Sequence, residues 1–488
     1  MKRFFYILFI IISCVTSCQQ SVKQIVTLNS QPDIWPDYNS VTIPAEIAPM
    51  NFNFIGGAYN YLTLKIKGSK SGSLETSGKF IDIDIDEWHS LTEANKGGYL
   101  ECYLSTTTKG IQTDYLPFKM YVSDVSLSEY GLTYRKVAPG YVSYSKMGIY
   151  CRNLSNFQED IIFENTAVLN TCVNCHTSNK TDPKDFVFHI RGKEHGGTVI
   201  QHNGNHKIFD TKTSQTLGSA VYPYWHKNGR YVAFSTNKTL QVFHTANPKR
   251  IEVFDTNSDL QIYDVDHQEF VLSDEIKNDS IMETFPSFSS DGNELYYCAT
   301  PKMQGTHYLE EIKYAIMRIK FDENTGKTIG TKDTLIYHPN QSSTLPRPSY
   351  DGKYLMYTVS NYGTFPIWHK EADLYLYSFA DSTTRPISEV NSEYSDSFHN
   401  WSDNSRWFVF TSRREDGLFT RLYISSIDEN GHCTKPFLLP QKNPLLYYNN
   451  LFLSYNTPDF TKEKVDVSLS TLRNEIQSDL RETIGTRE

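Results

Sequence analysis

The sequence predicts a mainly β protein with more than one domain. A chain of 488 residues is longer than one hydrophobic core usually supports. Aromatic residues make up 14% of it, with 33 Tyr and 28 Phe, which are residue types enriched in strands. The second half also contains a recurring unit of an aromatic residue, a tight polar turn and an apolar strand. With 21% charged and 39% hydrophobic residues, the composition indicates globular protein rather than disorder.

The start of the chain predicts export. Lys2 and Arg3 precede an apolar run over 4–12 that is too short to span a bilayer. Val15-Thr16-Ser17-Cys18 resembles a bacterial lipobox, so we expect a signal peptide over 1–17 and a lipid on Cys18. A flexible tether over 18–40 would follow, and the protein would be an outer-membrane lipoprotein on the periplasmic side. Ordinary cleavage without a lipid is the alternative.

The region 41–130 is expected to be a β-sandwich-like domain. Tyr61–Lys67 alternates apolar and polar residues, the pattern of a half-buried strand. Residues 79–86 alternate in the same way, with three Ile on one face and three Asp on the other. Such a row of Asp is more typical of the solvated face of a strand than of a calcium site. The sequence therefore predicts a second strand there.

A cysteine motif lies between this domain and the repeats. Cys172-Val173-Asn174-Cys175-His176 has the Cys-x-x-Cys-His spacing of covalent haem attachment. The two thiols can each add to a vinyl group of one haem, and His176 can bind the iron as proximal ligand. We expect the motif to lie on a linker over 131–195.

Other residues could complete a haem site. His189 is the first candidate for a sixth iron ligand. The weaker candidates are His195, Met147 and His226. Either Arg135 or Arg152 could pair with haem propionates. Without a sixth ligand, the iron would be open to a gas or a peroxide.

Three alternatives to haem remain open for the cysteine motif. Cys172 and Cys175 could form a short disulfide. They could join His176 and His189 in a zinc site, or they could carry no cofactor. Outside the motif, Cys102 and Cys151 could pair or stay free and buried; the sequence leaves this pairing open.

The repeats predict propeller blades. The turns in four copies contain Gly229, Gly292, Gly352 and Ser405, separated by 63, 60 and 53 residues. Asp-Gly and Asn-Gly accept the positive φ that a two-residue hairpin requires. Four strands fit into a unit of this size, as in a propeller blade. We expect the propeller over 196–460, with six blades of which some are degenerate.

The repeats resemble the TolB-type, WD40-like β-propeller family, whose blades carry a Ser-x-Asp-Gly-Lys-x-Leu-x-Tyr-like core. Ser290-Asp291-Gly292 and Tyr350–Leu355 match that core. Together with Ile47–Phe52 and Cys172–His176, the chain is similar to TolB-like lipoproteins of Bacteroidetes type that carry one haem motif ahead of the propeller. The resemblance implies an architecture more than an activity.

The end of the chain, 461–488, predicts a helical tail. Its apolar residues recur at helical spacing at Val465, Leu469, Leu472, Ile476 and Leu480. We expect this helix to pack on the propeller, although a partner-binding helix is the alternative.

These observations lead to two hypotheses about function. The first is a lipid-anchored monohaem cytochrome-like protein, in which the propeller docks a protein partner for electron transfer or haem-based sensing. The second is a non-catalytic binding or scaffold lipoprotein whose propeller binds protein or glycan, with the cysteine motif structural or zinc-binding. The sequence has no esterase, zincin or phosphate-loop signature, so a haem peroxidase is the remaining enzymatic option. A net charge of −9 disfavours nucleic acid as a partner.

Overall fold

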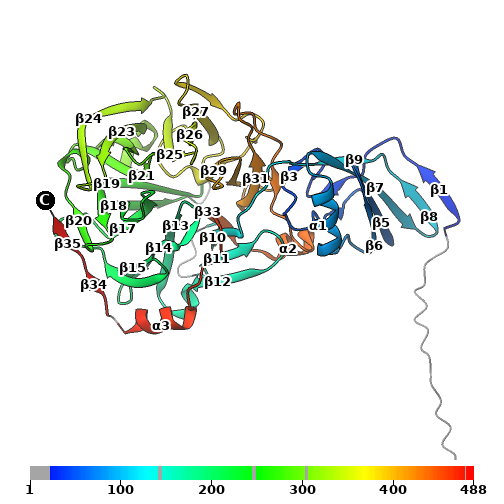
Figure 1. Ribbon diagram of the computed structural model, residues 1–488, viewed down its shortest axis with the longest axis horizontal. Helices are drawn as coiled ribbons and strands as arrows, with labels where there is room; N and C mark the ends of the chain where they lie inside the picture. The colour runs from blue at the N-terminus through cyan, green and yellow to red at the C-terminus, as the bar shows by residue number, and fades with distance from the viewer. Residues whose placement is uncertain (1–21, 141–144, 245–248, 303–305, 479, 488) are drawn as a thin grey trace, which may run out of the picture.

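The computed structural model describes residues 22–140, 145–244, 249–302, 306–478 and 480–487. It contains an N-terminal β domain beside a larger β-propeller, with the helix α3 (Leu469–Gln477) below the propeller in Figure 1. The expected signal peptide and Cys18 lie outside the described residues. No helix within the described ranges is long and apolar enough to cross a membrane.

The N-terminal domain is built on one seven-stranded sheet. The sheet runs in the order β1-β8-β7-β5-β6, with β9 on β7 and β3 on β9. The strands are β1 (Gln24–Thr27), β3 (Thr42–Ile43), β5 (Tyr61–Gly68), β6 (Ser73–Gly78), β7 (Gly98–Thr108), β8 (Ile111–Asp114) and β9 (Phe118–Val122). The helix α1 (Ile85–Ala94) contacts β5 and β6, and a short ribbon of β2 (Ile34–Trp35) and β4 (Asn53–Phe54) completes the domain. The second layer of the expected sandwich is thus a helix and extended chain rather than a full sheet.

Two local predictions in this domain are wrong. Residues 79–80 form a bend and 81–84 are not paired with any strand, and α1 begins directly after them. The Asp84 carboxylate accepts hydrogen bonds from the backbone N–H groups of Asp86 and Glu87, so it caps the helix instead of continuing a strand. The expected tether is ordered from Gln24 onward, because β1 pairs in parallel with β8.

The propeller has six blades, as the sequence predicted. The first strand of each blade neighbours the first strand of the next in cyclic order, so these strands form a ring about the axis. Blade 1 is β13 (Thr171–Asn179), β14 (Asp182–Gly192), β15 (Gly197–His202) and β16 (Asn205–Asp210); blade 2 is β17 (Ala220–Trp225), β18 (Tyr231–Phe243), β19 (Ile251–Asp264) and β20 (Glu269–Val271). Blade 3 is β21 (Ile281–Phe288), β22 (Glu294–Pro301), β23 (Ala315–Asp322) and β24 (Lys327–Ile336); blade 4 is β25 (Ser342–Pro348), β26 (Tyr354–Ser360), β27 (Asp373–Ser378) and β28 (Thr383–Pro386). Blade 5 is β29 (Asp396–Trp401), β30 (Trp407–Ser412), β31 (Arg421–Ser426) and β32 (Phe437–Leu438).

The ring is closed by a blade from two distant parts of the chain. In blade 6, β33 (Ser454–Thr461) pairs with β10 (Gly131–Val137), which continues to β11 (Gly148–Asn153) and β12 (Glu159–Glu164). The region 131–195 is therefore not a linker. It supplies three strands of blade 6 and the first two of blade 1, and 197–202 is the third strand of blade 1 rather than the start of the propeller.

The turns lie where the sequence predicted them, but each loop has four residues rather than two, as shown by the pairing of Ser289 N with Glu294 O at 2.9 Å on either side of one loop. Gly229, Gly292 and Gly352 have φ of 73°, 76° and 74°, and Ser405 has φ of 58°. The same turns are fixed by a short polar bond, such as the one from the Ser349 hydroxyl to Asp351 at 2.7 Å. Turn chemistry therefore located four blades correctly from the sequence.

The C-terminal tail packs on the propeller as expected, and it then continues as strands. Leu472 and Ile476 of α3 are buried in a core shared with blades 1 and 6. After α3, β34 (Glu482–Thr483) pairs with β16, and β35 (Gly485–Arg487) pairs with β20. The tail therefore crosses the outer edges of blades 1 and 2 and covers them.

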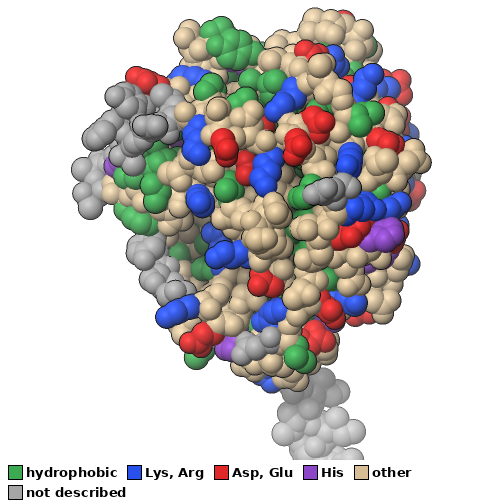
Figure 2. Space-filling model, turned by 90° about the vertical axis from the view of Figure 1, so that its left-hand side faces the viewer, with side chains coloured by type: hydrophobic (Ala, Val, Ile, Leu, Met, Phe, Trp, Pro, Cys, Tyr) green, Lys and Arg blue, Asp and Glu red, His purple; other side chains and the backbone are tan. Residues whose placement is uncertain are grey.

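The two domains share a hydrophobic core. One cluster joins side chains of the N-terminal sheet to those of blade 5 around Trp401 and Trp407. Cys102 and Cys151 are free and buried in separate cores, so the structure does not pair them. On the face shown in Figure 2, basic and acidic side chains are interspersed.

Candidate functional site

The cysteine motif lies on β13, the innermost strand of blade 1, and faces the propeller axis. Residues three apart on a regular strand point to opposite faces. Here Cys175 has φ of 56°, and the pairing of β13 with β14 shifts between Asn174 and Thr177. This bulge brings both Cys172 and Cys175 to the wall of one cavity on the axis.

The same bulge occurs in every blade. Each innermost strand has one non-glycine residue with φ between 43° and 56°, and all six of these residues line the cavity. They are Cys175, Tyr222, Phe285, Leu345, Phe398 and Thr457. The bulge at Cys175 is thus a property of the blade rather than of the cysteine motif. We call this space of about 270 Å³, which is partly open to solvent, the axial cavity.

Three arginines reach the axial cavity. Arg135 donates a hydrogen bond to Cys172 Sγ at 3.6 Å and another to Met147 Sδ at 3.4 Å. Arg191 lines the axial cavity and is exposed to solvent. Arg347 lies over the ring of Tyr224, at 5.2 Å from its centroid. None of the three forms an ion pair with a carboxylate among the residues that the structure describes.

Two buried carboxylates lie near these arginines. Asp459 accepts hydrogen bonds from Thr177 Oγ1 at 3.1 Å, Ser178 N at 3.0 Å and Asn400 Nδ2 at 2.8 Å, so it joins blades 5, 6 and 1. Burial raises its pKa to about 6. Burial also raises the pKa of Asp255 to about 7, so at neutral pH this carboxyl group is partly protonated and offsets the charge of Arg191 only in part.

His176 is buried between blades. Burial, aided by the Arg135 charge, lowers its pKa to about 4, so the ring is neutral at physiological pH. A backbone group of Thr133 is close enough to oppose part of this shift, yet neither ring nitrogen makes a hydrogen bond. Four other blades have Pro at the equivalent position, whereas His399 occupies it in blade 5 and also has two unpartnered nitrogens. This position is therefore a packing position between blades.

The other expected ligands are divided between the cavity and the scaffold. Met147 lies near Cys172, because both accept from Arg135. His189 Nδ1 is 3.0 Å from Thr198 Oγ1 and lines a different hollow. The remaining candidates also lie away from the axial cavity. His226 Nε2 forms a hydrogen bond with Gly292 O at 3.0 Å, and His195 lines a surface hollow. Arg152 donates hydrogen bonds to backbone carbonyl groups, such as Pro440 O at 3.0 Å.

The donor set can be compared with what a covalent haem requires. Cys172 and Cys175 are free thiols on one cavity wall, and His176 is neutral with unpartnered nitrogens, which suits attachment and iron ligation. However, the His176 ring packs 6.0 Å from Phe186 between blades. The cavity of about 270 Å³ also lies at the lower end of the roughly 300–1,000 Å³ of small-molecule sites, which leaves too little space for a group as large as haem. The two cysteines and His176 are therefore suitable donors for a haem, but the axial cavity in this conformation is too small to hold one.

One end of the axial cavity is covered by an extension of blade 2. Beyond the blade, β18 and β19 continue as a long hairpin whose Gln241 and Val253 line the cavity. The Tyr362 hydroxyl, from the segment after β26, donates to the Glu252 carboxylate, and Lys249 Nζ donates to the Tyr362 oxygen at 3.0 Å. We call these three side chains the latch, since they hold the hairpin against blade 4.

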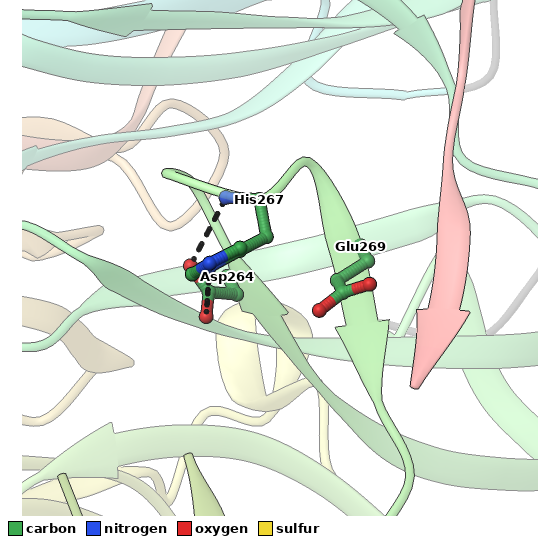
Figure 3. Close-up of side chains that lie close together, drawn as sticks. All are labelled: Asp264, His267 and Glu269. Carbon is green, nitrogen blue, oxygen red and sulfur yellow. Dashed lines mark hydrogen bonds and ion pairs between the residues drawn. The ribbon is translucent and has the colours of Figure 1, made fainter. Parts of the chain in front are cut away.

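A group with metal-like spacing lies far from the motif. Asp264, His267 and Glu269 bring their ligand atoms within 4.8 Å of one another (Figure 3). Arg230 Nη2 and Arg487 Nη2 already bond Asp264 Oδ2 at 2.8 and 3.2 Å. Burial by itself would raise the pKa of Asp264, but hydrogen bonds from Arg230 and His267 hold this pKa below its ordinary value. The group therefore anchors the C-terminal strand β35.

Comparison with known proteins gives likenesses of fold at low similarity. No protein-family model matches the sequence, and no curated protein matches it. Among solved structures, the chain is similar to an oligogalacturonate lyase in complex with manganese, at 12% identity over 64% of this chain and 74% of the other, with a TM-score of 0.37. It is also similar to the β-propeller domain of the Trilobed protease from Pyrococcus furiosus, at 11% identity over 67% and 79%, with a TM-score of 0.32.

A third likeness is to prolyl oligopeptidase B from Galerina marginata, at 10% identity with a TM-score of 0.35. It covers 62% of this chain and 43% of that enzyme, so the chain spans less than half of its length. The class of protein is thus set by the structure itself, which is a six-bladed β-propeller with a separate N-terminal β domain.

Proposed function

We propose that this protein is an exported, lipid-anchored binding protein whose axial cavity takes a small anionic molecule. The single observation that carries the proposal is that Arg135 and Arg191 line the axial cavity, and neither forms an ion pair with a carboxylate among the described residues. A guanidinium group that cavity walls shield in part from water gains from an anion that replaces its remaining hydration, and the gain is larger for Arg135, which is the more buried of the two. The lipid on Cys18 and a position on the periplasmic side of the outer membrane belong to the same proposal.

The cavity size decides which ligands the proposal includes. A space of about 270 Å³ closed by a hairpin admits a small molecule rather than a protein segment or a glycan chain. A protein or glycan partner would instead contact the outer surfaces of the propeller.

Thermal unfolding in sulfate, compared with chloride at equal ionic strength, tests the proposal. Sulfate should raise the melting temperature of the wild type by more than that of Arg191→Gln, because its general exclusion from protein surfaces stabilises both proteins equally. Arg318→Gln, at an exposed ion pair with Asp333, serves as a matched control and should respond like the wild type. An equal response of all three proteins to sulfate would contradict the proposal.

A monohaem protein for electron transfer or haem-based sensing is the second candidate. It is favoured by the two free thiols and the neutral His176 on one cavity. Cys172 and Cys175 would hold the haem, which would supply one-electron chemistry, and Arg135 would be near enough to pair with a propionate. The cavity would have to widen to admit it.

The visible spectrum of protein made with haem-maturation machinery tests this candidate. A haem that survives acid–acetone extraction, and is lost in Cys172→Ala, would support it. A colourless protein from the same host would refute it. Metal analysis of that colourless protein would test the zinc alternative, which requires about one zinc per chain bound through the cysteines.

A further inference from the structure

The axial cavity has two chemically different sides. Blades 6 and 1 contribute Arg135, Arg191, the Asn174 amide and the Asp459 carboxylate, which is already hydrogen-bonded to Thr177, Ser178 and Asn400. Across the axis, blades 3 to 5 contribute mainly apolar side chains, together with Arg347, His399 and Asn400, and the segment after β26 adds two more apolar residues. These apolar residues are Phe285, Leu345, Phe398, Phe365 and Ile367. An anion without an apolar part would interact only with the side that carries the two arginines.

The apolar side is packed and preorganised. The ring of Phe285 lies 4.3 Å from that of Tyr222 and 5.6 Å from that of Phe365. Phe285 and Leu345 are each 3% exposed, so their positions are set by packing inside the blades. A preorganised apolar surface gains free energy when a ligand displaces water from it, at little cost in side-chain entropy.

The polar side is equally specific. Arg135 is held by the sulfurs of Cys172 and Met147, and its Nε has no hydrogen-bond partner although it is buried. An unpartnered buried donor costs free energy that an acceptor on a ligand would recover. A carboxylate or another acidic oxygen is the acceptor that guanidinium groups bind best.

We propose that the axial cavity binds an amphipathic small anion. Its acidic head would pair with Arg135 and Arg191, and an apolar body about the size of an aromatic ring would lie against Phe285, Phe365 and Phe398. This inference rests on the proposed binding function and names the class of its ligand.

Calorimetric titration with three probes separates the inference from the function on which it rests. The probes are 3-phenylpropanoate, its neutral amide and inorganic sulfate. We expect the carboxylate to bind about tenfold or more tightly than either of the others, since each lacks one half of the interaction. If sulfate binds as tightly as 3-phenylpropanoate, the anion site stands and the amphipathic ligand is wrong. If none of the three binds, both proposals fail.

Substitutions at the axial cavity test which side chains bind the head group and the apolar body of 3-phenylpropanoate. Arg191→Gln should weaken 3-phenylpropanoate about 10- to 100-fold, and Arg191→Lys should recover part of the loss. Phe285→Leu should weaken 3-phenylpropanoate while leaving sulfate unchanged. Arg318→Gln should change neither affinity. If Arg191→Gln folds, with an unchanged circular dichroism spectrum, and binds 3-phenylpropanoate like the wild type, the assignment of the head group is refuted.

Discussion

Asp459 provides a test of how the propeller is closed. Its carboxylate is 2% exposed and joins three blades through Thr177, Ser178 and Asn400. Because burial raises its pKa from 3.8 to about 6, the folded protein binds this proton more tightly than the unfolded chain does. The stability that protonation provides is fully present below the unfolded pKa, and it is lost as the pH rises through about 6.

The expected size follows from the shift. A difference of about two pKa units corresponds to about 3 kcal/mol, of which about 2–3 kcal/mol is lost between about pH 4 and about pH 7. Asp459→Asn is nearly isosteric, and its Oδ1 can still accept from Thr177 and Ser178. The variant should therefore gain about 2–3 kcal/mol relative to the wild type over that range, or about 2–3 °C in melting temperature for a chain of 488 residues.

The measurement is thermal unfolding of the wild type and the variant in parallel across that pH range. Using the difference between the two proteins removes the contributions of other raised carboxyls, such as Asp255 and Asp373. Asp466→Asn, at an exposed position, should follow the wild type at every pH. A gap between Asp459→Asn and the wild type that does not change with pH would refute the reasoning.

Three further predictions concern the latch, blade 6 and the C-terminal strand. Tyr362→Phe removes the hydroxyl that donates to Glu252, so 3-phenylpropanoate should bind and leave about tenfold faster by stopped-flow fluorescence; an unchanged rate would mean that the hairpin does not control access. Gly131→Ala places a Cβ 1.8 Å from the Arg152 carbonyl oxygen, so we expect a loss of more than about 3 kcal/mol, and wild-type denaturant stability would contradict this. Arg487→Met should cost about 1 kcal/mol or less by denaturant unfolding, because that side chain is 32% exposed; a much larger loss would show that β35 is essential to the fold.

Much of the fold could be predicted because its turns have a strong local signature. Four blades were found from residues such as Gly292 and Gly352, where a left-handed turn requires glycine. The blades with altered turns were missed. Blade 1 turns through Lys180 and Thr181, at φ of 45° and 67°, and β33 of blade 6 pairs with β10 from the other end of the propeller. A blade assembled from two distant parts of the chain has no local sequence pattern, so 131–195 was predicted to be a linker.

Only part of the candidate site at the axial cavity could be predicted from the sequence. Spacing identified Cys172, Cys175 and His176, but it could not show that the motif lies on an innermost strand facing the axis. Arg191 was not identified, because one arginine on an alternating strand has no distinguishing context in the sequence. A usable signal was present nevertheless. Aligning the repeats on their turns would have placed His176 opposite a recurring proline and the cysteines at the axis.

The six left-handed positions on the axis have a consequence for how such a protein can change. The backbone at each position is set by the bulge of its blade, whether the residue is Cys175, Leu345 or Thr457. The blades therefore tolerate different side chains there without a change of scaffold. A new ligand preference could be acquired by replacing one of these residues at a time, each replacement altering one-sixth of the innermost ring. The propeller can in this way keep its architecture while its descendants diverge in what they recognise.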